Sequence, residues 1–383
     1  MADIEEFLKD REAQGLLRKL RPATLRLNGK IYFKHKEYVD FSSNDYLGLS
    51  SHPKLKEAAI KAINKFGVSS CASRLLSGDT EIFHALEDAV ARFKEKEAAL
   101  IFNSGYQANV GIISALFRKE DVIFSDRLNH ASIIDGILLS GARFFRFQHN
   151  NPEHLESLLK KERNKFKKAL IVSESIFSMD GDRAPLKELA RLKEKYNCQM
   201  MVDEAHATGI FGEKGSGVVE EEGLSSQVDL VMGTFSKALA GFGAYLAASR
   251  DIVDYLVNVC RSFIYSTALP PAIIACNLVS LELVREEAQR RKTLLSHAEL
   301  VRTKLKEQGL SVLGVSQIIP IILGDNLRAV EFAAKLQEKG FWALAVRPPT
   351  VPQGQARLRL SLSYDHDMEN LNRLIDAIAE IRI

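Results

Sequence analysis

The sequence predicts an α/β protein built on a mostly parallel β-sheet. Seven short apolar stretches have the length and composition of buried strands: 98–102, 121–126, 142–147, 168–174, 198–204, 228–234 and 244–249. Amphipathic, helix-like segments separate several of them, as at 106–119 and 152–168. Near-continuous apolar strands that alternate with helices are typical of a parallel sheet covered on both faces.

Three regions are expected along the chain: residues 1–40, 41–271 and 272–383. The first should hold a helix, because Ile4, Phe7, Leu8, Leu16, Leu17 and Leu20 recur at helical spacing, and a hairpin in NGKIYFKHKEYVDFS. The second is the large α/β domain. After Pro270-Pro271 a long helical pattern precedes strand-like 316–323, helical 326–340, strands at 341–346 and 356–362, and a last helix. This order predicts a smaller α+β domain.

The composition narrows the class of protein. Hydrophobic residues make up 46% of the 383 positions, and a net charge of +3 gives no reason to expect nucleic acid or a membrane surface as partner. Four scattered cysteines without a CxxC pair suit a reducing compartment better than disulfides or zinc. The chain opens without an apolar signal segment, and 268–284, its most apolar later stretch, is too short to span a bilayer. A cytoplasmic protein is expected.

Polar residues follow the ends of five predicted strands, where open α/β sheets bind their ligands. They stand in the stretches Asn103-Ser-Gly-Tyr106, Asn129-His130, Glu174-Ser-Ile-Phe-Ser178, Asp203-Glu-Ala-His206 and Thr234-Phe-Ser-Lys237. Gly105 opens a helix, and a helix N-terminus favours an anion. The five ends together combine an anion pocket, a carboxylate, two histidines, hydroxyl groups and a lysine.

The sequence predicts neither a nucleotide-binding loop nor a metal site. The chain has no GxxxxGK[ST] loop, and GFGAYL at Gly241 has Leu246 where a dinucleotide fingerprint needs its third glycine. Without an HExxH motif, neither His130 nor His206 has a metal-binding partner at a recognisable spacing, so no metal is expected. Each strand end alone also fits an ordinary structural role, such as a Ser-Gly turn that caps a helix. Their order is more specific than any single one.

In this order the motifs SGYQAN, NHASI, ESIFSMDGD, DEAHATG, GTFSKAL, YSTALPP, RPPTVP and ARLRLSL resemble the α-oxoamine synthases, pyridoxal-phosphate enzymes of the aspartate-aminotransferase fold. The resemblance runs from FSSNDYLGLS at Phe41 to the last helix. It implies fold type I of the pyridoxal-phosphate-dependent transferases, with a mostly parallel, seven-stranded central sheet. Departures are mild: SSC precedes Ala72 where GSG is usual, Tyr106 replaces a common Phe, and Ala207 replaces a frequent Gly.

The resemblance implies three catalytic residues. Lys237 would form a Schiff base with pyridoxal 5'-phosphate and, once released, act as the base at the substrate Cα. Asp203 would keep the pyridine nitrogen protonated, so that the ring can accept electrons. His130 would stack on the ring face and also contact the substrate.

The resemblance also implies binding roles for further residues. The phosphate would be bound by Gly105, Tyr106, Thr234 and, from the partner subunit of a homodimer with shared active sites, Thr267. The ring's oxygen substituents would be bound by Ser178 and His206. The amino-acid carboxylate would be bound by Arg359 and Arg347, since a planar bidentate donor suits it. The acyl substrate would be bound by Arg18 and Thr350. Arg357 and Arg359 share one face of a strand, so the pattern itself does not choose between them.

The activity that the resemblance implies is acyl transfer with loss of carbon dioxide. SSCASRLLSGDT, STALPP and RPPTVP are most similar to the member that joins L-alanine to a pimeloyl thioester, carried by coenzyme A or acyl carrier protein, in biotin biosynthesis. The basic run Leu17-Arg-Lys-Leu-Arg21 could meet the distal polar end of the pimeloyl group. A glycine-using synthase, such as 2-amino-3-ketobutyrate CoA ligase, is the alternative within the family. A non-catalytic nucleotide-binding module is the alternative outside it.

Overall fold

A computed structural model describes residues 2–381 and confirms the predicted α/β class. The chain forms two compact units. Unit 1 is made of the described residues up to Gly48, Ser178–Asp182, and those from Gln289 on; unit 2 is made of Leu49–Phe177 and Arg183–Ala288. These divisions differ from the boundaries expected at 40/41 and 271/272. The second lies later because α11 (Pro271–Glu286) packs on α2 and α3 within unit 2.

All seven predicted strands of the large domain form one sheet in unit 2. The order across the sheet is β4-β10-β9-β8-β7-β5-β6, and only β10 runs antiparallel to its neighbours. The strands are β4 (Ala98–Phe102), β5 (Val122–Asp126), β6 (Arg143–Phe147), β7 (Ala169–Glu174), β8 (Gln199–Asp203), β9 (Leu230–Thr234) and β10 (Ala244–Ala248). Most are buried along their whole length, which explains why they are apolar without alternation.

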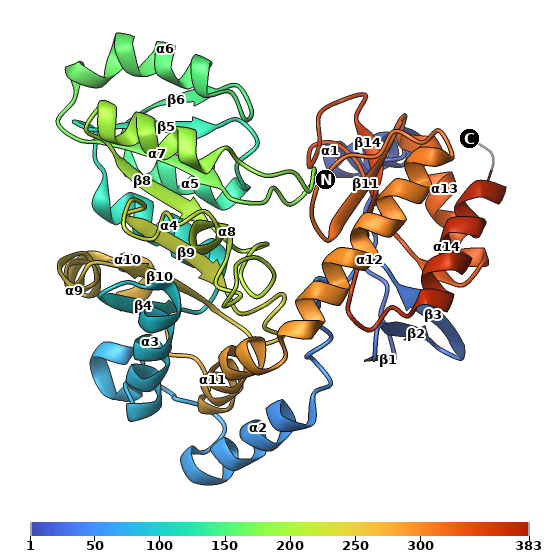
Figure 1. The fold of residues 1–383 in the computed structure, drawn as a ribbon, viewed down its shortest axis with the longest axis horizontal. Helices are drawn as coiled ribbons and strands as arrows, with labels where there is room; N and C mark the ends of the chain where they lie inside the picture. Colours follow the sequence, from blue (N-terminus) through green and yellow to red (C-terminus); the bar gives the residue numbers. More distant parts are fainter. Residues whose placement is uncertain (1, 382–383) are drawn as a thin grey trace. The chain divides into compact units, whose positions relative to one another are not determined.

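Helices cover the sheet of unit 2 (Figure 1). One face packs against α4, α5, α9 and α10 around a core that includes Ile112, Ile137 and Leu256. Helix α3 contacts β4 and β10, and α7 contacts β8. The helices are α2 (Pro53–Phe66), α3 (Glu81–Lys94), α4 (Gly105–Leu116), α5 (Ala131–Ser140), α6 (Pro152–Glu162), α7 (Leu186–Lys195), α8 (Val218–Glu221), α9 (Arg250–Val259) and α10 (Arg261–Ile264), with a π-helical turn at Arg74–Gly78 and a 3₁₀ turn at Arg163–Lys165.

Unit 1 holds the predicted hairpin and the smaller α+β region. The hairpin strands β2 (Lys30–Phe33) and β3 (Lys36–Asp40) lie between β1 (Leu25–Leu27) and β12 (Phe341–Trp342) in a four-stranded sheet. A three-stranded sheet has the order β11-β14-β13, with β11 (Ile318–Gly324), β13 (Ala345–Val346) and β14 (Ala356–Ser361). Its helices are α1 (Ala2–Ala13), α12 (Ala288–Glu307), α13 (Asn326–Glu338) and α14 (Met368–Glu380).

Several elements differ from the sequence prediction in their bounds. Helix α1 ends at Ala13, so Leu16, Leu17 and Leu20 follow it in irregular chain. The long helical pattern after Pro271 is two helices, α11 and α12, that meet at Glu287 and belong to different units. The single strand expected at 341–346 is divided into β12 and β13, which join different sheets. Within residues 2–381, none of the helices has the length and apolar character needed to cross a membrane.

Candidate active site

The strand-end residues of unit 2 gather at one edge of the sheet. Strands β5, β7, β8 and β9 are parallel neighbours, so their carboxyl ends lie side by side. Glu174 and Asp203 are direct partners in the register of β7 and β8. His130 follows β5, and Lys237 follows β9 after two intervening residues. The predicted convergence of these ends therefore depends on strand order, which the sequence did not supply.

Lys237 contacts His206 within this edge. The Nζ atom of Lys237 lies 2.7 Å from Nε2 of His206, and His206 is buried. A contact this short between two basic nitrogens needs one N–H to face one lone pair. One of the two nitrogens therefore donates a hydrogen bond to the other, which holds the lysine amine against an imidazole that can exchange protons.

Asp203 is a buried carboxylate with both oxygens hydrogen-bonded. Oδ1 accepts from the backbone N–H of Ala205 at 2.9 Å, and Oδ2 accepts from Nδ2 of Asn109 at 2.9 Å. The next residue, Glu204, pairs with Lys94 of α3 at 2.8 Å, and both side chains are fully buried. Burial lowers the pKa of Lys94, but the charges of Glu204 and Tyr245 and the hydrogen bonds to them together outweigh it, so the net pKa is raised.

The glycine at the end of β9 has a steric reason. A Cβ atom on Gly233 would lie 2.2 Å from the hydroxyl oxygen of Tyr245 on the neighbouring strand. That hydroxyl lies 2.9 Å from Oγ1 of Thr208, so Tyr245 connects β10 with the segment that follows Asp203. Only a residue without a side chain leaves room for this contact beneath the segment that carries Lys237.

His130 caps α5 and faces other site residues. Its Nδ1 accepts from the backbone N–H of Ser132 at 3.2 Å, and its ring centre lies 6.4 Å from that of Tyr106 in an edge-to-face arrangement. Burial lowers the pKa of His130; the charge of Asp203 opposes this and that of Lys237 adds to it. The imidazole is therefore favoured in its neutral form.

Glu174 is a site residue to which sequence reasoning gave no role. Its side chain is buried, and Oε1 accepts from the backbone N–H of His130 at 2.6 Å. Burial raises the pKa of Glu174 well above its usual value, and the charge of Asp203 raises it further. Its position at the end of β7, beside the end of β8, was the available signal. Glu174 follows an apolar run in the same way as Asp203, so the same reasoning could have singled it out.

The predicted phosphate-binding groups lie around the start of α4 and the end of β9. The Ser104 hydroxyl accepts from the backbone N–H of Gln107 at 3.2 Å and so caps α4. The backbone N–H groups of Gly105 and Tyr106 belong to the same first turn, where a helix provides no acceptor for them. The Thr234 hydroxyl donates to Gly243 O at 2.8 Å and shapes the turn before Lys237. Thr267 is exposed, with its backbone oxygen bonded to Asn103 at 2.8 Å.

Unit 1 distinguishes the two arginines that the strand pattern left equivalent. Arg357 forms an ion pair with Asp180 at 2.8 Å. Arg359 donates to Ser178 O at 2.5 Å and to the neutral oxygens of Asn44, Tyr46 and Ser361. Among residues 2–381 it forms no ion pair, and its side chain is buried. Of these two arginines, Arg359 is thus the one whose charge no described carboxylate balances. Ser178, a predicted ring contact, belongs to unit 1, where its backbone oxygen accepts from Arg359.

The predicted acyl-binding residues of unit 1 also meet. Arg18 donates to Oγ1 of Thr350 at 2.9 Å, over a long separation in sequence. Arg347 donates to Gly15 O, and burial together with the charge of Arg18 lowers its pKa. In the described part of the chain neither arginine forms an ion pair. Lys19 differs, because it pairs with Glu12 at 3.0 Å.

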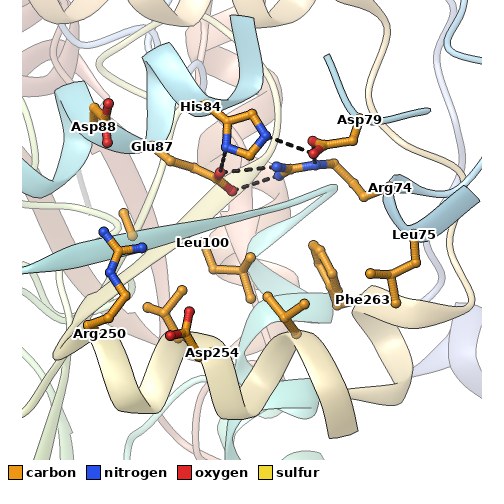
Figure 2. A pocket seen from close by; sticks show the side chains of 13 residues that line it. Arg74, Leu75, Asp79, His84, Glu87, Asp88, Leu100, Arg250, Asp254 and Phe263 are labelled. Carbon is orange, nitrogen blue, oxygen red and sulfur yellow. Dashed lines mark hydrogen bonds and ion pairs between the residues drawn. The ribbon is translucent and has the colours of Figure 1, made fainter. Parts of the chain in front are cut away.

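The stretch SSCASRLLSGDT and the helix that follows it contain a network of ion pairs within unit 2. A cavity of about 200 Å³ in unit 2 is lined by Arg74, Asp79, His84, Glu87 and residues of β4 and α9 (Figure 2). Arg74 bonds Glu87 and Asp79, both at 2.6 Å, and Asp79 also bonds His84 at 2.7 Å. The charges of Arg74, Asp79 and Glu87 therefore compensate one another. No predicted site residue lines this cavity.

No group of three or more His, Cys, Asp or Glu side chains suited to a metal ion exists within residues 2–381. The acidic and histidine side chains of the sheet edge instead bond to backbone amides and to neighbouring hydroxyl and amide groups. Such a donor set suits an organic ligand with both anionic and basic groups.

Comparison with known proteins decides the family. The model of aminotransferase class I and II matches residues 36–378, most of the chain. The chain belongs to this family. The resemblance to pyridoxal-phosphate enzymes of the aspartate-aminotransferase fold is thereby confirmed at the level of family and fold.

Several relatives and solved structures are similar to nearly the whole chain. An 8-amino-7-oxononanoate synthase of Geobacter sulfurreducens is 48% identical over 98% of this chain and 96% of its own length. A putative 8-amino-7-oxononanoate synthase of Geobacillus kaustophilus is 45% identical over 93% of this chain and 90% of its own. Among solved structures, a serine palmitoyltransferase of Sphingomonas wittichii superposes with a TM-score of 0.93 at 32% identity, covering 99% and 96% of the two chains. An 8-amino-7-oxononanoate synthase of Francisella tularensis has a TM-score of 0.78 at 31% identity, covering 90% and 97%.

Proposed function

We propose that this protein is a pyridoxal-phosphate-dependent acyltransferase that condenses L-alanine with a pimeloyl thioester. The products would be 8-amino-7-oxononanoate, carbon dioxide and the free thiol carrier, as a step of biotin biosynthesis. The observation that carries the proposal is the contact between Lys237 and His206 beside the buried Asp203. It occurs in a chain that is 48% identical to a curated 8-amino-7-oxononanoate synthase over nearly its full length.

The groups at the sheet edge of unit 2 suit pyridoxal phosphate chemically. The cofactor supplies an aldehyde that captures amines and a ring that accepts electrons from the substrate Cα. Lys237 offers the primary amine, and Asp203 offers a buried negative charge for the ring nitrogen. The first-turn amides of α4 offer donors for the phosphate. The Thr234 hydroxyl, which donates to Gly243 O, would have to turn its hydrogen toward the phosphate to join them. Within this assignment Lys237, paired with His206, removes the Cα proton, and His130 lies against the ring.

Arg359 is the proposed ligand of the alanine carboxylate. Its neighbours are neutral oxygens, whereas Arg357 is already neutralised by Asp180. A buried guanidinium without a carboxylate partner is costly unless a ligand provides the charge. For Arg347 we propose a role at the acyl substrate and not at the amino-acid carboxylate, because its charge acts on that of Arg18, the other predicted acyl-binding arginine.

Arg18, Arg347 and Thr350 are proposed to bind the acyl substrate. Two arginines that repel one another and form no ion pair in the described residues favour an anionic ligand. The distal carboxylate of a pimeloyl group has this charge. A short acyl group, such as the acetyl group used with glycine in the alternative reaction, offers no such partner.

We further propose a cytoplasmic homodimer in which Thr267 binds the phosphate of the partner's site. Thr267 is exposed, and Tyr265 beside it leaves 73% of its surface open, as an interface residue would in a single chain. A two-fold pair is the commonest closed assembly. The four free cysteines are consistent with a reducing compartment.

The test is a product assay with alanine, glycine and serine, each against pimeloyl-CoA, pimeloyl acyl carrier protein and acetyl-CoA. We expect alanine with a pimeloyl thioester to give the highest kcat/KM, with alanine preferred to glycine by about 10- to 200-fold, because one methyl group discriminates weakly. A higher rate with glycine and acetyl-CoA would reject the named reaction. Lys237→Ala should abolish turnover, and borohydride reduction followed by peptide mapping should label Lys237 in the native chain.

The acyl assignment has a matched control in the same basic run. Arg18→Ala should raise KM for the pimeloyl thioester about tenfold, as expected for a lost charge-assisted hydrogen bond. Lys19→Ala removes a cation one residue away that pairs with Glu12, and KM should stay within twofold. Equal effects of the two substitutions would mean that Arg18 acts only through the general charge of the run.

A further inference from the structure

An unbroken chain of hydrogen bonds connects Asp203 with His130 through two residues that have no assigned role. Nδ2 of Asn109 donates to Oδ2 of Asp203 and to Oγ of Ser132, both at 2.9 Å. Oγ of Ser132 lies 2.8 Å from Nδ1 of His130. Asn109 comes from α4 and Ser132 from α5, the helix that His130 caps. Both residues are buried, so the two side chains that link Asp203 to His130 are shielded from solvent.

The contacts define which nitrogen of His130 carries the proton. The backbone N–H of Ser132 points at Nδ1 at 3.2 Å, and a backbone N–H can only donate. Nδ1 therefore acts as an acceptor, and the proton of the neutral ring resides on Nε2. The Ser132 hydroxyl already accepts from Asn109, so its own hydrogen is available for Nδ1.

The orientation of Asn109 follows from the charge of its neighbour. Its amide nitrogen faces the Asp203 carboxylate, while Oδ1 is buried without a hydrogen-bond partner among the described residues. Turning the amide over would place Oδ1 against a carboxylate oxygen, which repels it. The unsatisfied Oδ1 is a cost that the two donations of Nδ2 offset.

We propose that Asn109 and Ser132 are positioning residues, which orient the Asp203 carboxylate and hold His130 as its neutral Nε2–H tautomer. This assignment rests on the proposed function, in which Asp203 faces the ring nitrogen of the cofactor and His130 lies against the ring. The hydrogen bonds among these four residues do not depend on the cofactor. The chain makes the direction of the carboxylate and the tautomer of the imidazole depend on one amide group.

The arrangement has a chemical purpose. A His130 held with Nε2–H presents a donor, and no charge, to whatever lies against its free edge. The charges of Asp203, Asp135 and Lys237 all act on the ring, and burial lowers its pKa. Hydrogen bonds to Nδ1 stabilise the unprotonated nitrogen further. Loss of the Ser132 hydroxyl should therefore raise the pKa of His130 and weaken the preference for the Nε2–H tautomer.

The test is nitrogen NMR of the full-length protein labelled with ¹⁵N-histidine, recorded without and with saturating pyridoxal phosphate. The His130 resonances are assigned by their loss in His130→Asn. Native protein should show one neutral tautomer, protonated at Nε2. Ser132→Ala should shift the tautomer ratio about fivefold toward Nδ1–H, the effect of one lost hydrogen bond. Ser132→Thr, which keeps the hydroxyl, should restore the native pattern.

Two further variants separate positioning from general packing. Ser114→Ala removes a hydroxyl of α4 that bonds only within its own helix, to the oxygens of Val110 and Gly111, and should leave the His130 signals unchanged. Asn109→Ala should also disturb the tautomer ratio, by about twofold, and weaken pyridoxal-phosphate binding to the purified chain by about tenfold, because Asp203 loses an orienting donor. Circular dichroism of each variant reports whether it is folded.

The outcomes are distinct. A native His130 protonated at Nδ1, or an unchanged tautomer in folded Ser132→Ala, overturns the inference whatever the cofactor does. A tautomer change in Ser132→Ala that Ser132→Thr reverses supports it. If the native chain fails to bind pyridoxal phosphate, the proposed function fails, and the NMR result still decides the positioning role.

Discussion

Replacing Lys94 with Met tests the buried ion pair beneath the sheet edge. The side chains of Lys94 and Glu204 expose 2% and 0% of their surface, and Nζ lies 2.8 Å from Oε2. Met keeps the length of the side chain but leaves Glu204 without its cation. Oε1 still accepts from Val219 N at 2.9 Å, so one oxygen remains satisfied. Breaking a buried pair from one side typically costs about 3–5 kcal/mol.

The free energy can be bounded from the chemistry of the orphaned acid. Protonating a glutamate at pH 7, with a reference pKa of about 4.3, costs about 3.7 kcal/mol, and about 1.4 kcal/mol less for each pH unit below that. Glu204 is expected to take this route, because an unpaired buried charge costs more. Lys94→Met should thus lose about 3–4 kcal/mol of unfolding free energy at pH 7, and the loss should grow as pH rises, since the folded variant binds a proton that the unfolded chain lacks.

Urea unfolding followed by circular dichroism at pH 6, 7 and 8 measures both the loss and its slope. Lys96→Met is the matched control, because Lys96 donates only to the backbone oxygens of Ser225 and Val228 and its loss leaves no buried acid. The double variant Lys94→Met/Glu204→Gln should recover most of the stability and abolish the slope. A loss below about 1 kcal/mol, or one that is equal at pH 6 and pH 8, would refute the reasoning.

Three further predictions concern unit 1 and the end of β9. Arg359→Ala should lower kcat/KM for alanine by about 10- to 100-fold, whereas Arg357→Ala, which leaves Asp180 unpaired, should mainly lower stability; steady-state kinetics and thermal unfolding distinguish them, and the reverse pattern would exchange their roles. His366 is buried, and burial lowers its pKa to about 4, so the unfolded chain binds the proton first and stability should fall as pH drops from about 6.5 to about 4. His366→Phe should remove this part of the pH dependence of the unfolding free energy; the same pH dependence in both proteins would contradict the prediction. Gly233→Ala should destabilise the protein by about 1–3 kcal/mol, because its Cβ would overlap the Tyr245 hydroxyl; a neutral effect on thermal unfolding would mean that β9 can shift freely.

The sequence by itself determined the elements and the order of the chemical groups. The seven apolar runs became the seven strands of one sheet because residues buried on both faces must be apolar, and this requirement is visible locally. Lys237, His206 and Asp203 could be singled out because each follows such a run. Parallel strands bring their carboxyl ends to one edge, so position along the chain carried spatial information.

Only the tertiary structure decided what each polar group faces. The pattern of β14 makes Arg357 and Arg359 equivalent, and they differ because Asp180, from a distant segment, lies beside one of them. Asn109 and Ser132 lie inside quoted motifs without any mark of their role, since a hydrogen bond between α4 and α5 depends on how the helices pack. Hydrophobic pattern is a property of neighbours in sequence. Charge compensation and hydrogen-bond direction are properties of neighbours in space, which no local pattern encodes.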